Sequence, residues 1–92
     1  MQTIWKYVLQ IRENNTISMP KDATFLHAAE QNGEVYVWVR VDPDRPKVNR
    51  HIAIYGTGHP IPTRFQQYVG TAHIKIQSQP ELVWHIFDLG EF

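Results

Sequence analysis

The sequence contains no cysteine. Disulfide bonds, thiolate metal ligands and cysteine nucleophiles are therefore excluded, and nothing indicates an oxidising compartment. The sequence also lacks an excess of charge of either sign, because nine Lys and Arg residues balance nine Asp and Glu residues. A neutral chain has no general attraction for duplex DNA, RNA or an anionic membrane, so any basic site on this protein must be local.

Long apolar runs are missing as well. The opening Met1-Gln2-Thr3-Ile4-Trp5-Lys6 has no basic segment followed by an apolar one, and no stretch approaches the length of a membrane span. We therefore expect the protein to act in the cytoplasm. With 92 residues we expect a single domain, residues 1–92. So short a chain buries only about 60% of the surface that its unfolded form exposes, so a homo-oligomer is expected.

Apolar and polar residues alternate along much of the chain, which is typical of half-buried strands. The clearest example is residues 34–41, where four valines occupy alternate positions and Tyr36, Trp38 and Arg40 occupy the others. The pattern predicts an all-β fold, a small antiparallel sandwich or barrel of six to seven short strands. The expected strands are residues 3–11, 16–19, 24–31, 34–41, 50–55, 68–77 and 82–87.

Turn residues separate these segments. Asn32-Gly33 supplies the positive φ angles of a type I′ hairpin, which favours a strand over a short helical turn for residues 24–31. Residues 42–47 contain two prolines and four charges and are expected to form a solvated loop. Residues 56–64 are expected to form a structured loop and residues 65–67 a turn of helix. We expect a turn at residues 78–81 and a short tail at residues 88–92.

The segment Tyr55-Gly56-Thr57-Gly58-His59-Pro60-Ile61-Pro62-Thr63-Arg64 is the most distinctive in the chain. Two glycines expose backbone amides beside three polar side chains, Thr57, His59 and Arg64, so the loop could hold a phosphate. It is neither a Walker loop nor a dinucleotide fingerprint. The competing interpretation is a plain turn with positive φ at both glycines, stiffened by the prolines.

Two further groups have alternative interpretations. Arg45, Lys47 and Arg50 form the one basic cluster in the sequence. They belong either to a solvated loop or, if that loop folds toward residues 56–64, to a ring of four cations around a small anion. We expect exposed side chains at Tyr36, Trp38 and Arg40, because the four valines that alternate with them face the core. Such a stripe is either an oligomer interface or a platform on which a base stacks.

Catalytic and metal-binding patterns are weak. The five histidines, His27, His51, His59, His73 and His85, show no i, i+2 pair that would place two ligands on one strand face. Carboxylates are scattered among turns, and there is no nucleophile elbow. We therefore expect no metal, no cofactor and no enzymatic activity.

The loop Tyr55-Gly56-Thr57-Gly58-His59-Pro60-Ile61-Pro62, together with residues 4–7, 16–20, 41–43 and 83–87, carries a resemblance to known proteins. On these segments the chain resembles a family of small proteins found in bacteriophages and prophages. The resemblance covers nearly the whole chain, and the loop is its specific part. The resemblance implies a viral accessory protein that acts in the cytoplasm of a bacterial host cell. It supplies no catalytic residue.

Two hypotheses follow. In the first, a homo-oligomer binds a small phosphorylated nucleotide, similar to the viral sponges that sequester cyclic oligonucleotide immune signals. The ligand-binding residues would be Tyr55, Gly56, Thr57, Gly58, His59 and Arg64, with Trp38, Arg40, Arg45 and Lys47. In the second, the protein inhibits a host protein directly through Tyr36, Trp38 and Arg40. Neither hypothesis involves a long nucleic acid or a membrane.

Overall fold

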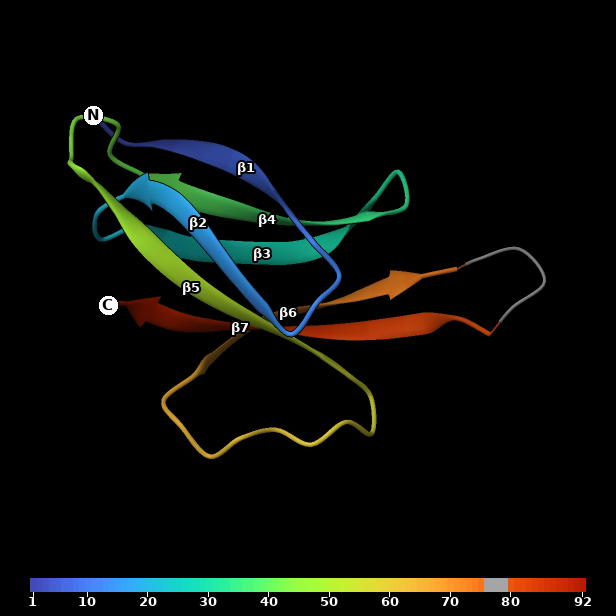
Figure 1. The fold of residues 1–92 in the computed structure, drawn as a ribbon. Helices are drawn as coiled ribbons and strands as arrows, with labels where there is room; N and C mark the ends of the chain where they lie inside the picture. Colours follow the sequence, from blue (N-terminus) through green and yellow to red (C-terminus); the bar gives the residue numbers. More distant parts are fainter. Residues whose placement is uncertain (76–79) are drawn as a thin grey trace.

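Two antiparallel sheets make up the part of the chain that the structure, a computed structural model, describes: residues 1–75 and 80–92. One sheet has the order β1-β4-β3 and the other the order β2-β5-β7-β6 (Figure 1). The expected all-β class is confirmed. The seven strands of the described chain are β1 (Thr3–Leu9), β2 (Asn14–Pro20), β3 (Thr24–Gln31), β4 (Glu34–Val41), β5 (Lys47–Gly56), β6 (Gln67–Ile74) and β7 (Leu82–Glu91).

The core lies between the inner faces of the two sheets. The four valines of β4 face inward and are at most 1% exposed, as the alternation predicted. They form one apolar cluster with Ile52 and Ile54 of β5 and Ile86 of β7. Because burial of apolar surface is the main force that stabilises a small domain, this cluster fixes which face of each strand is free for binding.

The sheets approach each other closely where β3 lies against β6. A Cβ atom built on Gly70 of β6 would lie 3.0 Å from the Ala28 carbonyl oxygen and 3.1 Å from the Ala28 nitrogen. These contacts are with backbone, which cannot move aside as a flexible side chain would. Glycine at position 70 therefore allows the two edge strands to close the sandwich on this side.

The hairpin between β3 and β4 forms as the sequence predicted. Asn32 has a φ of 54° and Gly33 a φ of 83°, which is the conformation of a type I′ turn. The strand over residues 24–31 is confirmed, together with the strand over residues 34–41.

Several predicted strand ends were wrong. The first strand ends at Leu9, because Asn15 accepts a hydrogen bond from the Gln10 nitrogen at 3.0 Å and turns the chain. Ile11, inside the strand range predicted for residues 3–11, therefore lies beyond the strand and is 46% exposed. The second strand is longer than expected at both ends, and the fifth is longer as well, since it begins at Lys47, inside the expected solvated loop.

The C-terminal half of the chain also differs from expectation. No helical turn forms at residues 65–67, because Gln67 already starts β6. β7 continues to Glu91, so residues 88–92 are not a tail. Residues 76–77 of the expected sixth strand and residues 78–79 of the expected turn lie outside the described residues.

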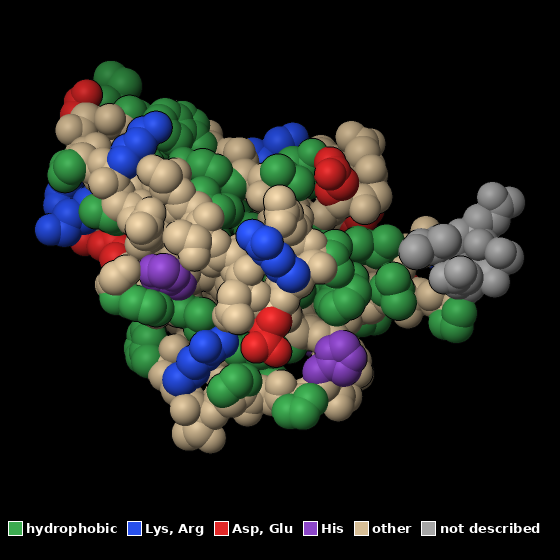
Figure 2. All heavy atoms as spheres, in the orientation of Figure 1, with side chains coloured by type: hydrophobic (Ala, Val, Ile, Leu, Met, Phe, Trp, Pro, Cys, Tyr) green, Lys and Arg blue, Asp and Glu red, His purple; other side chains and the backbone are tan. Residues whose placement is uncertain are grey.

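Charged side chains of both signs are scattered among neutral ones on the face seen in Figure 2, which agrees with the zero net charge. A binding site for an anion must therefore come from a small number of cations that the fold brings together.

Within the described part of the chain, no helix has the length and apolar character needed to cross a membrane.

Candidate ligand-binding site

Residues 57–64 of the glycine loop are exposed, but several of their polar groups bond to the protein itself. The His59 nitrogen donates to the Gly56 carbonyl oxygen at 3.1 Å, and Gly58 has a φ of 87°, which makes residues 56–59 a type II turn. Gly56 does not have a positive φ, contrary to expectation. A Cβ at position 56 would lie 2.7 Å from the His59 ring, but that exposed side chain can move aside. The turn thus explains the positive φ of Gly58 without a bound phosphate.

Arg64, the expected phosphate ligand in this loop, contacts the protein itself. Its guanidinium donates to the Tyr55 hydroxyl at 2.8 Å, and that hydroxyl donates to Gln66 Oε1 at 2.9 Å. Gln66 in turn donates from its amide nitrogen to the Pro62 carbonyl oxygen at 2.9 Å. These bonds link residues 62–66 to the hydroxyl of the buried Tyr55. One function of Arg64 is therefore to stabilise the conformation of the loop.

Tyr55→Phe tests this network. The substitution removes the hydroxyl that accepts a hydrogen bond from Arg64 and donates one to Gln66. The loss of these two bonds is expected to cost about 1 kcal/mol of folding free energy. Faster amide hydrogen exchange confined to residues 57–66 would accompany the loss. Unchanged exchange in this segment would contradict the proposed role of the hydroxyl.

The hollow beside the glycine loop does not suit an anion. Its volume is about 390 Å³, and its walls combine Gly56, Thr57 and His59 with the beginning of β7, where the preceding Glu81 contributes a carboxylate. No Lys or Arg is among the described residues that line it. Thr57 Oγ1 lies 2.8 Å from His85 Nε2, so this hydroxyl is also engaged.

The structure does not bring the two expected halves of the phosphate site together. Lys47 begins β5 and Gly56 ends it, and an extended strand of that length separates its ends by about 30 Å. Arg45 is bound elsewhere, because its guanidinium donates to Asp22 Oδ2 at 2.6 Å. The ring of four cations expected around one anion is therefore not assembled within one chain.

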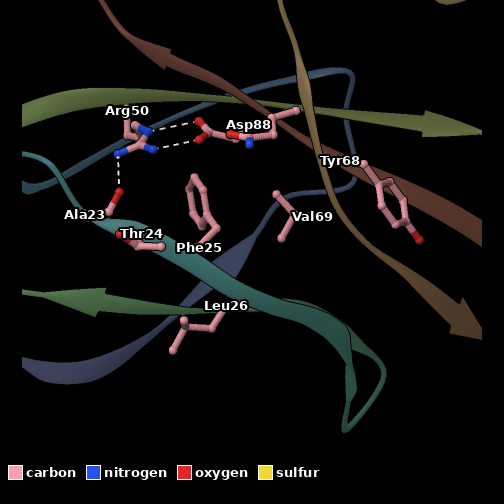
Figure 3. A pocket seen from close by; sticks show the side chains of 9 residues that line it. Ala23, Thr24, Phe25, Leu26, Arg50, Tyr68, Val69 and Asp88 are labelled. Atoms are coloured by element: carbon pink, nitrogen blue, oxygen red, sulfur yellow. Dashed lines mark hydrogen bonds and ion pairs between the residues drawn. The ribbon is translucent and has the colours of Figure 1, made fainter.

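Arg50, the third member of the basic cluster, is buried in the sandwich. Its guanidinium makes two bonds to Asp88, at 2.9 Å and 2.6 Å, and one to the Ala23 carbonyl oxygen at 2.8 Å (Figure 3). The Phe25 ring lies below it, with its centroid 4.9 Å from the guanidinium carbon. The hydrogen bonds to Asp88 raise the pKa of Arg50 above its usual value, so the guanidinium stays protonated.

This ion pair lies at a cavity of about 340 Å³ between β3 and β6. Arg50 also lies 3.5 Å from the Glu91 carboxylate, so two acidic groups balance its single charge. The arrangement gives no net attraction for an anion. It links the turn before β3 to the opposite sheet, which is a structural function.

A better site for an anion is a hollow of about 510 Å³ at the Lys47 end of β5, opposite the end that carries the glycine loop. We name it the lysine hollow, and it is lined by Ser18, Lys21, Lys47, Val48, Asn49, Glu91 and Phe92. The β2-β5 register pairs Ser18 with Asn49 and Pro20 with Lys47, and the Lys21 nitrogen donates to the Pro46 carbonyl oxygen at 2.8 Å. Backbone pairing thus places both ammonium groups at one hollow.

The electrostatics of the lysine hollow favour an anion. Lys21 and Lys47 are exposed, and neither forms an ion pair with a described residue. The one carboxylate in the lining, Glu91, accepts from the Asp22 nitrogen at 2.8 Å and lies 3.5 Å from Arg50. Part of the Glu91 charge is therefore balanced inside the protein. Neither lysine charge is balanced by an ion pair with a described residue.

An aromatic ring borders the same hollow. Phe92 stacks on His51 with ring centroids 3.9 Å apart and an interplanar angle of 18°. His51 Nε2 lies 2.9 Å from the Phe92 carbonyl oxygen, and His51 Nδ1 lies 3.3 Å from Thr16 Oγ1, which fixes the imidazole. Because Phe92 is 82% exposed, its outer surface is available to a flat ligand.

Trp38 and Arg40 lie on the outer face of the sheet β1-β4-β3, where Arg40 is exposed as expected but Tyr36 and Trp38 are half-buried. We name this surface the aromatic face, formed by residues of β1, β3 and β4 that point away from the core. Trp38 contacts His27 at a centroid distance of 5.7 Å and Tyr36 at 6.2 Å. Lys6 Nζ lies 4.6 Å over the Tyr36 ring and donates to Gln31 Oε1 at 2.7 Å. The expected stripe is therefore a wider surface that includes two neighbouring strands.

Sequence reasoning missed most of the lysine hollow. Lys47 was expected to bind a ligand, but Lys21, Ser18, Asn49 and Phe92 were not considered. One signal was available, because Pro20-Lys21 and Pro46-Lys47 both place a lysine after a strand-limiting proline. Their adjacency depends on the pairing of β2 with β5, which the sequence does not state. No group of three or more metal-ligating side chains forms among residues 1–75 and 80–92.

A family model described as "Domain of unknown function (DUF7352)" matches residues 1–91. The chain belongs to this family. The match covers all seven strands and the lysine hollow except Phe92, so both belong to a single family domain. No curated protein matches the chain, and no solved structure does.

Proposed function

We propose that this protein is a non-catalytic binding protein that captures a small phosphorylated ligand of the nucleotide type in the lysine hollow. The observation that carries the proposal is the placement of Lys21 and Lys47 beside one hollow that also has an exposed aromatic ring. Lys21 and Lys47 would neutralise phosphate charge, and the Ser18 hydroxyl and Asn49 amide would donate to its oxygens. The Phe92 ring would stack on a base.

The cellular role follows from the bacteriophage resemblance of the sequence. A binding protein without catalytic groups lowers the free concentration of its ligand by sequestering it. We propose that the protein acts in the cytoplasm of a bacterial host, where the ligand is a cyclic oligonucleotide or related signal of antiviral immunity. The hollow of about 510 Å³ lies within the range of small-molecule sites.

Isothermal titration calorimetry with AMP, a cyclic dinucleotide and uncharged adenosine tests the proposal. We expect heat from the two phosphorylated compounds and none from adenosine. In the variant Lys21→Ala/Lys47→Ala, affinity is expected to fall about 100-fold, because each exposed charge-assisted contact contributes roughly a factor of ten.

Two control variants make the test specific. Lys6→Ala removes a lysine from the aromatic face, and Arg64→Ala removes the cation of the glycine loop. Both are expected to bind like the wild type. If Arg64→Ala abolished binding while the double lysine variant retained it, the ligand site would lie at residues 55–64 and the lysine hollow would be excluded.

Direct inhibition of a host protein is the second candidate function. The observation that favours it is the exposure of Ile4 and Val8, 57% and 49%, which lie beside Arg40 and Tyr36 on the aromatic face. Aromatic residues and arginine are the types that anchor protein interfaces. A stoichiometric host protein that co-purifies with the wild type and is lost with Trp38→Ala, in the absence of nucleotide, would support this function over ligand capture.

A further inference from the structure

We infer that the aromatic face binds a second copy of this chain, forming a two-fold symmetric dimer. The face remains open in the single chain, although its strands carry large apolar side chains. Ile4 is 57% exposed and Val8 is 49% exposed, and the pairing of β1 with β4 places them beside Arg40 and Tyr36. Exposed apolar side chains next to aromatic ones on one face of a small domain mark an interaction site.

The strand register gives the positions of the side chains on this face. Along β4, the outward residues in order are Glu34, Tyr36, Trp38 and Arg40. β1 places Val8 beside Tyr36 and Lys6 beside Trp38, and β3 places Ala29 beside Tyr36 and His27 beside Trp38. The pattern is therefore acidic at one end of β4, aromatic in the middle and basic at the other end.

This order is self-complementary about its centre. We place a two-fold axis in the plane of the face, perpendicular to β4 and between Tyr36 and Trp38. The second copy then lies on top of the first with its β4 running in the opposite direction. Arg40 then meets Glu34 of the second copy, and the symmetric contact forms at the other end. Each Trp38 then lies opposite Tyr36 of the second copy, whose ring also has the Lys6 ammonium 4.6 Å from its centroid.

Neighbouring strands fit the same operation. On β3, His27 meets the small side chain of Ala29 of the second copy. At the ends of β3, Thr24 pairs with Arg40 and Gln31 pairs with Glu34 within one chain. In the dimer Thr24 of one copy therefore meets Gln31 of the other. Large residues thus face small ones and polar residues face polar ones. The pair of Lys6 with Val8 of the second copy is the least favourable contact, but Lys6 already extends along the face toward Gln31.

Charge favours a second copy over an unrelated partner. Arg40 forms no ion pair with a described residue, and Glu34 accepts a hydrogen bond only from Tyr36 among the described residues, at 3.1 Å. A second copy supplies the opposite charge to both residues at once. The lysine hollow, which includes outward residues of the other sheet, stays open in this dimer.

Charge reversal combined with native mass spectrometry tests the dimer. The three short strands form a small interface, so a dissociation constant in the micromolar range is expected for the wild type. Arg40→Glu alone and Glu34→Arg alone each place like charges at two symmetric contacts. Both variants are expected to weaken the dimer at least about tenfold while remaining folded by circular dichroism.

Mixing the two variants gives the decisive result. One chain then has acidic residues at both positions and the other has basic residues, so a heterodimer forms with both contacts restored. The double variant Arg40→Glu/Glu34→Arg should likewise regain the homodimer. Arg12→Glu reverses an exposed charge away from the face and should leave the dimer unchanged.

Four outcomes would overturn the inference. The wild type could be monomeric at about 100 μM, well above the expected micromolar dissociation constant. The mixed or doubly reversed variants could fail to dimerise, or Arg12→Glu could weaken the dimer as much as Arg40→Glu does. A host protein bound to this face of a monomer would also overturn it and would support the second candidate function. None of these results affects nucleotide binding at the lysine hollow, which is measured separately.

Discussion

Asp88→Ala is expected to lower the free energy of unfolding by about 3–5 kcal/mol, enough to leave much of a marginally stable domain of this size unfolded. Asp88 is 7% exposed and Arg50 is 8% exposed, so the substitution leaves a buried guanidinium without its bidentate partner. Glu91, at 3.5 Å, replaces only part of the lost interaction. Urea denaturation followed by tryptophan fluorescence measures the change.

The double variant Arg50→Met/Asp88→Leu separates the cost of an unpaired charge from the contribution of the pair. Replacement of both partners by apolar groups removes the desolvation penalty of the charges, so most of the lost stability should return. A single variant that costs less than about 1 kcal/mol would show that solvent reaches the guanidinium freely. A double variant that is as unstable as the single one would show that the pair itself provides the stability.

Gly70→Val is expected to destabilise the protein by about 3 kcal/mol, the upper end of the usual cost of overpacking. A Cβ on Gly70 would meet the Ala28 backbone at 3.0–3.1 Å, and the branched side chain would add two methyl groups in the same space. β3 and β6 would have to move apart, which would open the sandwich at the cavity that contains Arg50. Thermal unfolding measures the loss of stability. Faster amide hydrogen exchange at residues 25–28 would report that β3 and β6 have moved apart.

Two controls distinguish steric conflict from a general loss at β6. His73→Val introduces the same side chain at an exposed β6 position and should cost less than about 1 kcal/mol. Ala28→Gly/Gly70→Val should not restore stability, because backbone atoms of residue 28 make two of the three close contacts. Full rescue by the double variant would contradict this explanation.

Local patterns in the sequence predicted the centre of the fold but not its edges. The alternation in β4 and the Asn32-Gly33 turn depend on neighbouring residues, and both predictions were confirmed. The end of β7 depends on a bulge at Leu89, where His51 pairs with Gly90 and Ile52 with Asp88. This extra residue places the Asp88 and Glu91 carboxylates on the same side, although a regular strand would point them to opposite faces. Alternation alone could not reveal this arrangement.

The basic cluster of the sequence was divided by strand geometry. Lys47 and Arg50 are three positions apart in one strand, so their side chains lie on opposite faces, one in solvent and one in the core. The prediction treated residue 47 as part of a loop and therefore kept the cations together. The partner that Lys47 acquires, Lys21, comes from another strand end through long-range pairing. Such pairing leaves no local signal.

The central claim, that the lysine hollow binds a phosphorylated ligand, is tested most directly by mapping a cyclic dinucleotide titration with backbone and side-chain NMR. We expect saturable shift changes at Ser18, Lys21, Lys47 and Asn49, with a ring-current effect near Phe92 and unchanged signals at residues 57–64. Shifts confined to residues 57–64 or to Trp38, or no shifts at all, would contradict the claim.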